Sequence, residues 1–258
     1  MESFSVDENC HLVNAGVESK RESSRESREV LLMTLTEEAV HIKDANQLLD
    51  AFYLPFESGW KRLDTGVINV AARTHMIGCT PAMVDWWIGF LHHSEEYRWW
   101  HPRDHVFSDW EGDCKPGEYL GRTHLAHEYI GSRLYKLKIH FRDPGEILDK
   151  RRFADAKVGT AVHGYVGAIG ENGWFGRLLH LIQDTPEGCV MRSRFWLGEM
   201  DPVPNPKPTP EILQKLVPDE LGAGLFAHCC EEMSILAGFL PTVYRIHNAD
   251  TERPKRTQ

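Results

Sequence analysis

The chain has 258 residues and carries 29 Lys plus Arg against 38 Asp plus Glu, which gives a formal charge of −9. Hydrophobic residues make up 41 % and charged residues 26 %, close to the averages of globular proteins, so the composition excludes a largely disordered chain. The acidic excess offers no basic stripe that could neutralise phosphates, so the composition also argues against a nucleic-acid-binding protein.

Three further features bear on the compartment. The apolar stretch from Ala82 to Leu91 is interrupted by Asp85 and is shorter than the ~20 apolar residues of a membrane span, so we expect no membrane partner. The first twenty residues contain no hydrophobic run behind a basic start, so we expect no secretory signal. No two of the six cysteines form a Cys-x-x-Cys pair, which indicates reduced thiols in a cytoplasmic protein.

The N-terminal region differs in composition from the rest of the chain. Residues 18–29 are almost all charged or Ser and show no apolar periodicity, which is typical of a segment that cannot join a core. We therefore expect a flexible tail over residues 1–35 and a single domain over residues 36–258. A short amphipathic stretch from Ala39 to Phe52 stands at the start of this domain.

A strand and a helix follow. The segment from Gly66 alternates between apolar and polar residues and ends at Gly78, which predicts a β-strand. Thr80 is then suited to an N-cap and Pro81 to the first helical position. The next residues place apolar side chains at helical spacing, namely Met83, Trp87, Phe90 and Leu91.

Further segments have strand character and are separated by Gly-rich turns, which indicates an antiparallel sheet. These segments are Tyr119 to Tyr129, Ser132 to Phe141, Val158 to Ile169, Phe175 to Asp184 and Gly188 to Leu197.

The C-terminal third predicts a stiff connector followed by a long helix. Asp201 to Pro210 holds five of the 14 prolines and cannot be a helix or a central strand. Asp219 to Leu240 contains no proline, and we expect Pro241 to end it as one helix. The predicted fold class is α+β, with a curved antiparallel sheet around a long C-terminal helix.

This last helix places polar residues where a core stripe is expected. Counted at 100° per residue, His228 and Glu232 lie one turn apart in the middle of an apolar stripe. A carboxylate that faces a core is costly unless it is paired or bound to a metal ion. A buried His and Glu bonded to neighbouring side chains is the simpler alternative. The stripe itself consists of Leu221, Leu225, Leu236 and Phe239.

Other segments supply more groups of the same kind. His101 and His105 flank a proline, and a predicted strand puts His124 and Glu128 on one face. Each histidine taken singly is more often a surface residue or a hydrogen-bonded core residue. Taken together, two imidazoles and two carboxylates suit Zn²⁺ and would also accept Fe²⁺ or Mn²⁺.

Five segments in this order resemble the 2,4-diacetylphloroglucinol hydrolases, a family to which phloretin hydrolase is related. The resemblance covers roughly residues 50–245. The segments are His75 to Leu91 with its preceding Thr, Tyr97 to His105 (YRWWHPRDH), Thr123 to Gly131 (THLAHEYIG), Arg192 to Gly198 (RSRFWLG) and Ala227 to Met233 (AHCCEEM).

The resemblance implies a helix-grip fold of the START and birch-pollen-allergen type, with zinc in a cavity between the sheet and the long helix. It also implies hydrolysis of the carbon–carbon bond that joins an acyl group to a phenolic ring, with an aromatic ketone as the small-molecule partner. The resemblance is compatible with a homodimer.

The resemblance further implies four zinc ligands, two His and two Glu. His228, Glu232 and Glu128 match three of them. His101 matches the fourth, and His105 is the alternative because fewer residues separate His101 from Glu128 than in the family.

Candidate substrate contacts surround these ligands. Asp104 stands three residues after His101, where a relative carries Asn, and His93 stands where the family has a substrate-contacting tyrosine. Trp100 is a candidate for the lining of an apolar cavity that holds a flat ring.

Candidate catalytic residues complete the hypothesis. Proton shuttles are sought among His105, His124 and His163, because the pKa of histidine lies near neutrality. Arg194, or its neighbour Arg192, could hold a phenolate. Two rival functions are a ligand carrier without metal and a non-haem iron oxygenase that uses two His and one carboxylate.

Overall fold

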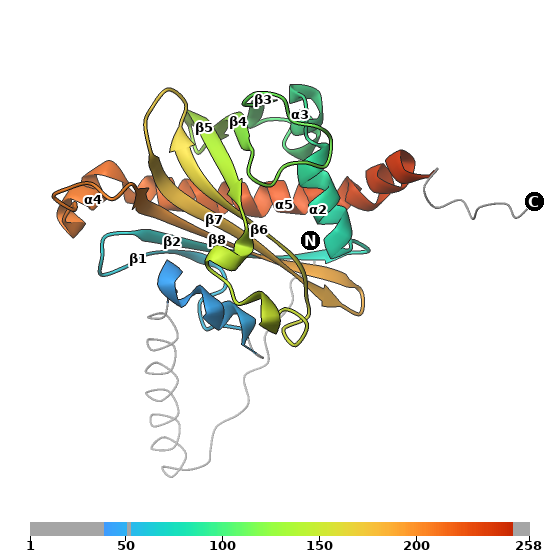
Figure 1. The fold of residues 1–258 in the computed structure, drawn as a ribbon, viewed down its shortest axis with the longest axis horizontal. Coiled ribbons are helices and arrows are strands. Elements are labelled where there is room, and N and C mark those ends of the chain that lie inside the picture. The colour runs from blue at the N-terminus through green and yellow to red at the C-terminus, as the bar shows by residue number, and fades with distance from the viewer. Residues whose placement is uncertain (1–38, 51–52, 250–258) are drawn as a thin grey trace, which may run out of the picture. The chain divides into compact units, whose positions relative to one another are not determined.

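The strands form one eight-stranded antiparallel sheet in the order β1-β2-β8-β7-β6-β5-β4-β3 (Figure 1). The computed structural model describes residues 39–50 and 53–249, so the tail predicted over residues 1–35 lies outside the described residues. Strands β4 to β8 correspond to the five strands predicted after residue 118, whereas β1 and β3 were not predicted. The bounds are β1 Gly59–Arg62, β2 Ile68–Ile77, β3 His105–Trp110, β4 Thr123–Ile130, β5 Arg133–Arg142, β6 Val158–Ala168, β7 Trp174–Thr185 and β8 Gly188–Asp201.

The long C-terminal helix α5, Asp219–Asn248, runs across one face of this sheet (Figure 1). Its inner stripe is buried and packs into the core that β2 and the other strands line. This arrangement confirms the predicted α+β fold with a sheet around a long helix. The other helices are α2 Pro81–Phe90, α3 Ser94–Trp100 and α4 Pro210–Leu216, with 3₁₀ helices at Ile42–Leu49, Pro144–Glu146 and Lys150–Arg152.

Helix α5 does not end at Pro241, as the sequence predicts, but continues to Asn248. Proline lacks the N–H that would bond the carbonyl of Ala237, one turn earlier. That carbonyl instead faces the Cys79 thiol, with 3.7 Å between the sulfur and the oxygen. Beyond the proline, Tyr244 packs edge-on against Trp86 of α2 with 5.2 Å between ring centroids. A substitute hydrogen bond and aromatic packing therefore carry the helix past its proline.

By length and composition alone, α5 is also apolar enough to cross a membrane. The core helix of a soluble protein meets the same test, and the buried stripe of α5 packs against the sheet.

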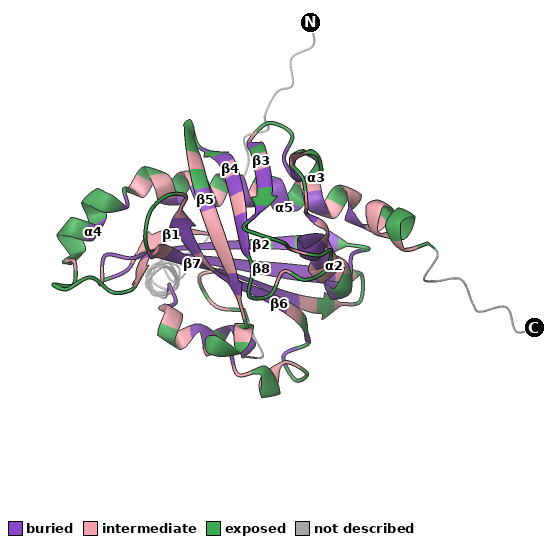
Figure 2. Ribbon diagram, turned by 45° about the horizontal axis from the view of Figure 1, so that its top comes forward, coloured by how far each residue is buried: buried purple, intermediate pink, exposed green. Residues whose placement is uncertain are grey.

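Both faces of the sheet are covered at its centre. Strand β8 is buried over ten consecutive residues, 189–198 (Figure 2). Side chains that alternate with period two therefore meet two different cores. Phe195 faces the core with α5, whereas Trp196 faces a second core with Leu48 of the N-terminal 3₁₀ helix.

Arg192 and Arg194 share the outer face with Trp196 and enclose the carboxylate of Glu57. One Glu57 oxygen lies 2.5 Å from Arg192 Nη2 and the other 2.9 Å from Arg194 Nη2. Burial raises the pKa of Glu57, but the hydrogen bonds and charges of the two guanidinium groups outweigh it, so the net pKa is lowered. The placement differs from the expectation that Arg194 or Arg192 holds a phenolate, because strand alternation turns both away from the face that packs on α5.

Replacement of Glu57 by Gln leaves two buried guanidinium groups without their anion, and we expect a loss of about 3–5 kcal/mol of stability at pH 7. Because the folded-state pKa of Glu57 lies below its ordinary value of 4.5, its contribution is complete above about pH 4.5 and is lost as the pH falls through the lowered pKa. Urea unfolding of the wild-type protein and of Glu57→Gln between pH 3 and 7 measures the difference in the free energy of unfolding. The exposed Glu187→Gln is the matched control, and equal stability of the two variants would contradict the prediction.

Candidate metal centre

His228 and Glu232 lie one turn apart on the buried stripe of α5 and are 4 % and 8 % exposed. His228 Nε2 is 3.8 Å from a Glu232 oxygen. Burial, followed by the charge of Glu128, raises the pKa of Glu232 to about 8, although His228 lowers it. A carboxylate in this position is therefore stable as an anion at neutral pH only beside an additional positive charge.

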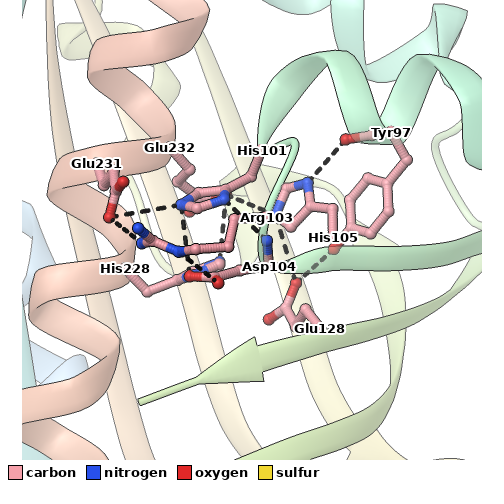
Figure 3. Close-up of polar contacts among 9 residues, drawn as sticks. All are labelled: Tyr97, His101, Arg103, Asp104, His105, Glu128, His228, Glu231 and Glu232. Carbon is pink, nitrogen blue, oxygen red and sulfur yellow. Dashed lines mark hydrogen bonds and ion pairs between the residues drawn. The ribbon is translucent and has the colours of Figure 1, made fainter. Parts of the chain in front are cut away.

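Two further donors come from the edge of the sheet. His105 is the first residue of β3 and pairs with Glu128 of β4 in the antiparallel register. His105 Nε2 lies 3.4 Å from a Glu232 oxygen and 3.8 Å from a Glu128 oxygen (Figure 3). Sheet pairing and the facing helix thus bring the side chains together from three elements.

The tautomer of His105 suits a metal ligand. Its Nδ1 lies 2.9 Å from the carbonyl oxygen of Tyr97, and a carbonyl only accepts, so Nδ1 carries the hydrogen. The lone pair of Nε2 therefore points at the two carboxylates. Nε2 of His105 and both ring nitrogens of His228 are buried without a hydrogen-bond partner among the described residues.

Together these groups fit a divalent cation. The donor atoms of His105, Glu128 and His228 lie within 4.8 Å of one another, and Glu232 adds a second carboxylate. Two imidazole nitrogens and two carboxylate oxygens form a donor set that Zn²⁺ accepts, as do Fe²⁺ and Mn²⁺. We call these four residues the His105 cluster.

His101 lies beside both histidines of the cluster, with its ring stacked on His228 at 5.0 Å and 5.4 Å from the His105 ring between centroids. It also has metal-binding neighbours, because His101, Asp104 and His228 have donor atoms within 4.8 Å of one another. However, the backbone N–H of Asp104 donates to His101 Nδ1 at 3.1 Å. In the neutral ring the hydrogen is then on Nε2, which lies 3.5 Å from an Asp104 oxygen. Between the two histidines that the sequence left open, the geometry favours His105 as the ligand.

Asp104 stands behind His228 rather than inside the cavity. Its carboxylate lies 3.6 Å from His228 Nδ1 and 3.0 Å from Nε of Arg103. At this distance the carboxylate makes no hydrogen bond to the ring, but it stands on the Nδ1 side of His228, where outer partners of metal-bound histidines stand. This differs from the predicted substrate contact.

Tyr97 is a residue that the sequence analysis missed. Its ring stacks on His105 at 3.7 Å between centroids, and its hydroxyl donates to Glu128. Burial, followed by the charge of Glu128, raises the pKa of Tyr97 well above its ordinary value. The spacing could have identified this residue. His93, which stands where the family has a tyrosine, lies eight residues before His101, and Tyr97 lies the same eight residues before His105.

A cavity between the sheet and α5 adjoins the cluster, and the predicted site residues Trp100 and His124 are among those that line it. His124 Nε2 lies 2.7 Å from Ser108 Oγ. His180, which was not predicted, also lines this cavity, and its Nδ1 lies 2.8 Å from Ser193 Oγ. Burial lowers the pKa of both histidines to about 4, so both rings are neutral at pH 7.

Two other predicted residues lie away from this cavity. His163 alternates with Val162 on β6, its Nδ1 lies 2.8 Å from the carbonyl of Leu178, and it lines a separate surface groove. His93 is exposed at the start of α3, where its backbone N–H donates to the Glu96 carboxylate at 3.0 Å. Neither placement fits the predicted role, proton shuttle for His163 and substrate contact for His93.

Comparison with known proteins adds an independent observation. A family model described as the DAPG hydrolase PhiG domain matches residues 40–245. The chain is 29 % identical to 2,4-diacetylphloroglucinol hydrolase of Pseudomonas protegens over 79 % of this chain and 73 % of that protein. It is 31 % identical to phloretin hydrolase of Eubacterium ramulus over 69 % and 68 %.

Among solved structures, protein Ms6760 from Mycobacterium smegmatis is similar with a TM-score of 0.42 and 12 % identity. The similarity covers 71 % of this chain and 96 % of that one. The fold described above rests on the strand order and the position of α5, not on this similarity.

Substitution of the two rival histidines separates the two possible ligand sets. We expect His105→Gln to retain no stoichiometric metal ion after dialysis, because it removes a direct donor. His101→Gln should keep one ion per chain, with affinity lowered at most ~10–100-fold, as for an outer partner. Elemental analysis and chelator competition measure this, with the exposed His75→Gln as control. Metal loss in His101→Gln alone would reverse the assignment.

Proposed function

The chain belongs to the DAPG hydrolase family, and from this premise we propose that it is a zinc-dependent hydrolase. Its substrate would be a polyhydroxylated aromatic ketone, cleaved at the bond between the ring and the acyl group. The observation that carries the proposal is the convergence of two imidazoles and two carboxylates, buried beside a cavity, in a chain with these relatives.

The reaction explains why a metal ion belongs in this place. An aryl ketone does not lose its acyl group to water, because an aryl carbanion is too unstable to depart. A hydroxyl beside the acyl group allows a keto tautomer, which makes the scissile bond that of a β-diketone. When bound to the His105 cluster, a zinc ion would supply Lewis acidity toward the carbonyl and would lower the pKa of water toward neutrality.

The residues of the chain supply the remaining functions. Water contributes a hydroxyl to the acyl carbon and a proton to the ring carbon, so the products are a carboxylic acid and the deacylated ring. Within the cluster, Glu128 lies beside His105 and accepts a hydrogen bond from the Tyr97 hydroxyl, so it is placed to hold the proton taken from water. Tyr97 keeps its own proton, because its pKa is raised.

The proton for the ring carbon needs a path along the cavity. His124 and Ser108 form a hydrogen-bonded pair in its wall, 2.7 Å apart. In this proposal the neutral imidazole of His124 relays a proton rather than storing one, because its pKa of about 4 keeps it uncharged at pH 7.

The proposal includes a cytoplasmic location, supported by the free thiols of Cys79, Cys114, Cys189, Cys229 and Cys230.

Anaerobic incubation of the zinc-loaded protein with acetylphloroglucinol should release acetate and phloroglucinol. We expect Glu232→Gln to lose at least ~100-fold in kcat/KM, because a buried ligand and its charge are removed. The control is Glu220→Gln, an exposed position on the same helix that should keep full activity. Product analysis by chromatography decides the outcome. Strict dependence on O₂ would favour an iron oxygenase, and ketone binding without turnover or stoichiometric metal would favour a carrier.

The substitution Tyr97→Phe should leave the ring stacked on His105 but remove the hydrogen bond that the hydroxyl donates to Glu128. We expect kcat to fall ~10–100-fold, as for other outer partners of a metal site, with zinc content preserved. Steady-state kinetics and elemental analysis on the same preparation measure both. Unchanged kcat would show that the Tyr97 hydroxyl does not position Glu128.

A further inference from the structure

The cavity between the sheet and α5 has two lobes that differ in chemistry. The histidine lobe is lined by Trp110, His124, Phe141, Val162 and His180. The apolar lobe is lined by Leu137, Val166, Phe175, Leu197 and Leu221. Both are bounded by Ile139, Leu178, Phe195, Leu225 and Glu128, so they adjoin each other on the same face of the sheet.

The histidine lobe combines flat apolar surface with hydrogen-bonding groups. His124 and His180 stand on β4 and β7, and each has one ring nitrogen bonded to a serine hydroxyl. Neither imidazole belongs to the His105 cluster. Aromatic walls with neutral imidazoles between them suit a ring whose hydroxyl groups donate hydrogen bonds at its edge.

The apolar lobe offers almost no polar partner. Its wall is aliphatic and aromatic, and apart from Glu128 only Tyr135 brings a polar atom. Leu137 is 7 % and Leu197 5 % exposed, so this surface faces the interior. Such a space favours an alkyl or aryl chain over a hydroxylated ring, whose hydroxyl groups would lose their hydrogen bonds to water without replacement.

The His105 cluster adjoins the boundary between the lobes. Glu128 lines both lobes, whereas His228 and Glu232 line the histidine lobe one turn beyond Leu225, which again lines both. A ketone whose carbonyl lies at the cluster would therefore place one substituent in each lobe.

We propose that the substrate binds with its hydroxylated ring in the histidine lobe and its acyl chain in the apolar lobe, and that the enzyme prefers apolar acyl groups longer than acetyl. This inference rests on the proposed function, since it concerns the two halves of the same ketone.

The chain-length dependence of the reaction tests the preference. Acylphloroglucinols with acetyl, butanoyl, hexanoyl and 3-phenylpropanoyl groups are compared on the zinc-loaded wild-type protein. We expect kcat/KM to rise about fourfold for each added CH₂ group until the lobe is filled. A value that stays constant or falls from acetyl onward would overturn the inference while leaving the hydrolase proposal intact. Absence of hydrolysis for every ketone by protein with one zinc ion per chain would instead refute the proposed function.

A substitution that fills the apolar lobe tests the location of the acyl chain. Leu221→Trp should lower the ratio of kcat/KM for the hexanoyl and acetyl ketones at least tenfold relative to wild type. Ile212→Trp, at an exposed position on α4, is the matched control and should keep the ratio. Zinc content and melting temperature report folding, and Leu197→Phe is the second variant if Leu221→Trp does not fold. An unchanged ratio in a folded variant would overturn the location.

The position of the hydroxylated ring is tested separately by His180→Phe, which keeps an aromatic side chain and removes the ring nitrogens. We expect the KM of the trihydroxy ketones to rise ~2–10-fold, with the chain-length dependence unchanged. A changed chain-length dependence in His180→Phe, together with an unchanged one in Leu221→Trp, would show the reverse orientation.

Discussion

The burial of the Glu232 carboxylate on the inner face of a core helix is the constraint on which the rest of the site depends. An anion among leucines is stable there only next to a cation, and burial accordingly raises the pKa of Glu232. The elements around α5 supply the other donors. Strand pairing sets His105 beside Glu128, and the spacing of one helical turn sets His228 beside Glu232.

The second layer around these donors determines what each histidine can do. His105 gives its Nδ1 hydrogen to a backbone carbonyl, whereas His101 receives a backbone N–H at the same atom. Two histidines four residues apart thus present opposite tautomers toward the carboxylates. Asp104 and Tyr97 extend this layer, one behind His228 and the other behind Glu128. The cluster is therefore preorganised by groups that lie outside it.

Periodicity predicts much of this arrangement, because it depends on which side of an element a residue occupies. The alternation around His124 and Glu128 and the stripe around His228 and Glu232 follow from spacing alone. The choice between His101 and His105 does not, since it depends on backbone hydrogen bonds where the unpredicted α3 meets the unpredicted β3. Arg194 shows the same limit, because alternation puts it on one face of β8 without telling which face holds the cavity. The continuation of α5 past Pro241 depends on a thiol more than 150 residues away in sequence, which no local pattern contains.

The two-sided burial of β8 has a consequence for divergence within the family. On this strand Arg192 and Arg194 hold Glu57 in an ionic clasp on one face, while on the other face Phe195 lines the ligand chamber and Ser193 bonds to the chamber histidine His180. Successive positions along the strand thus serve separate tasks, scaffold integrity and molecular discrimination. Mutations at every second residue can remodel the chamber while the clasp stays intact, so new substrate ranges can evolve without first dismantling the framework that supports them.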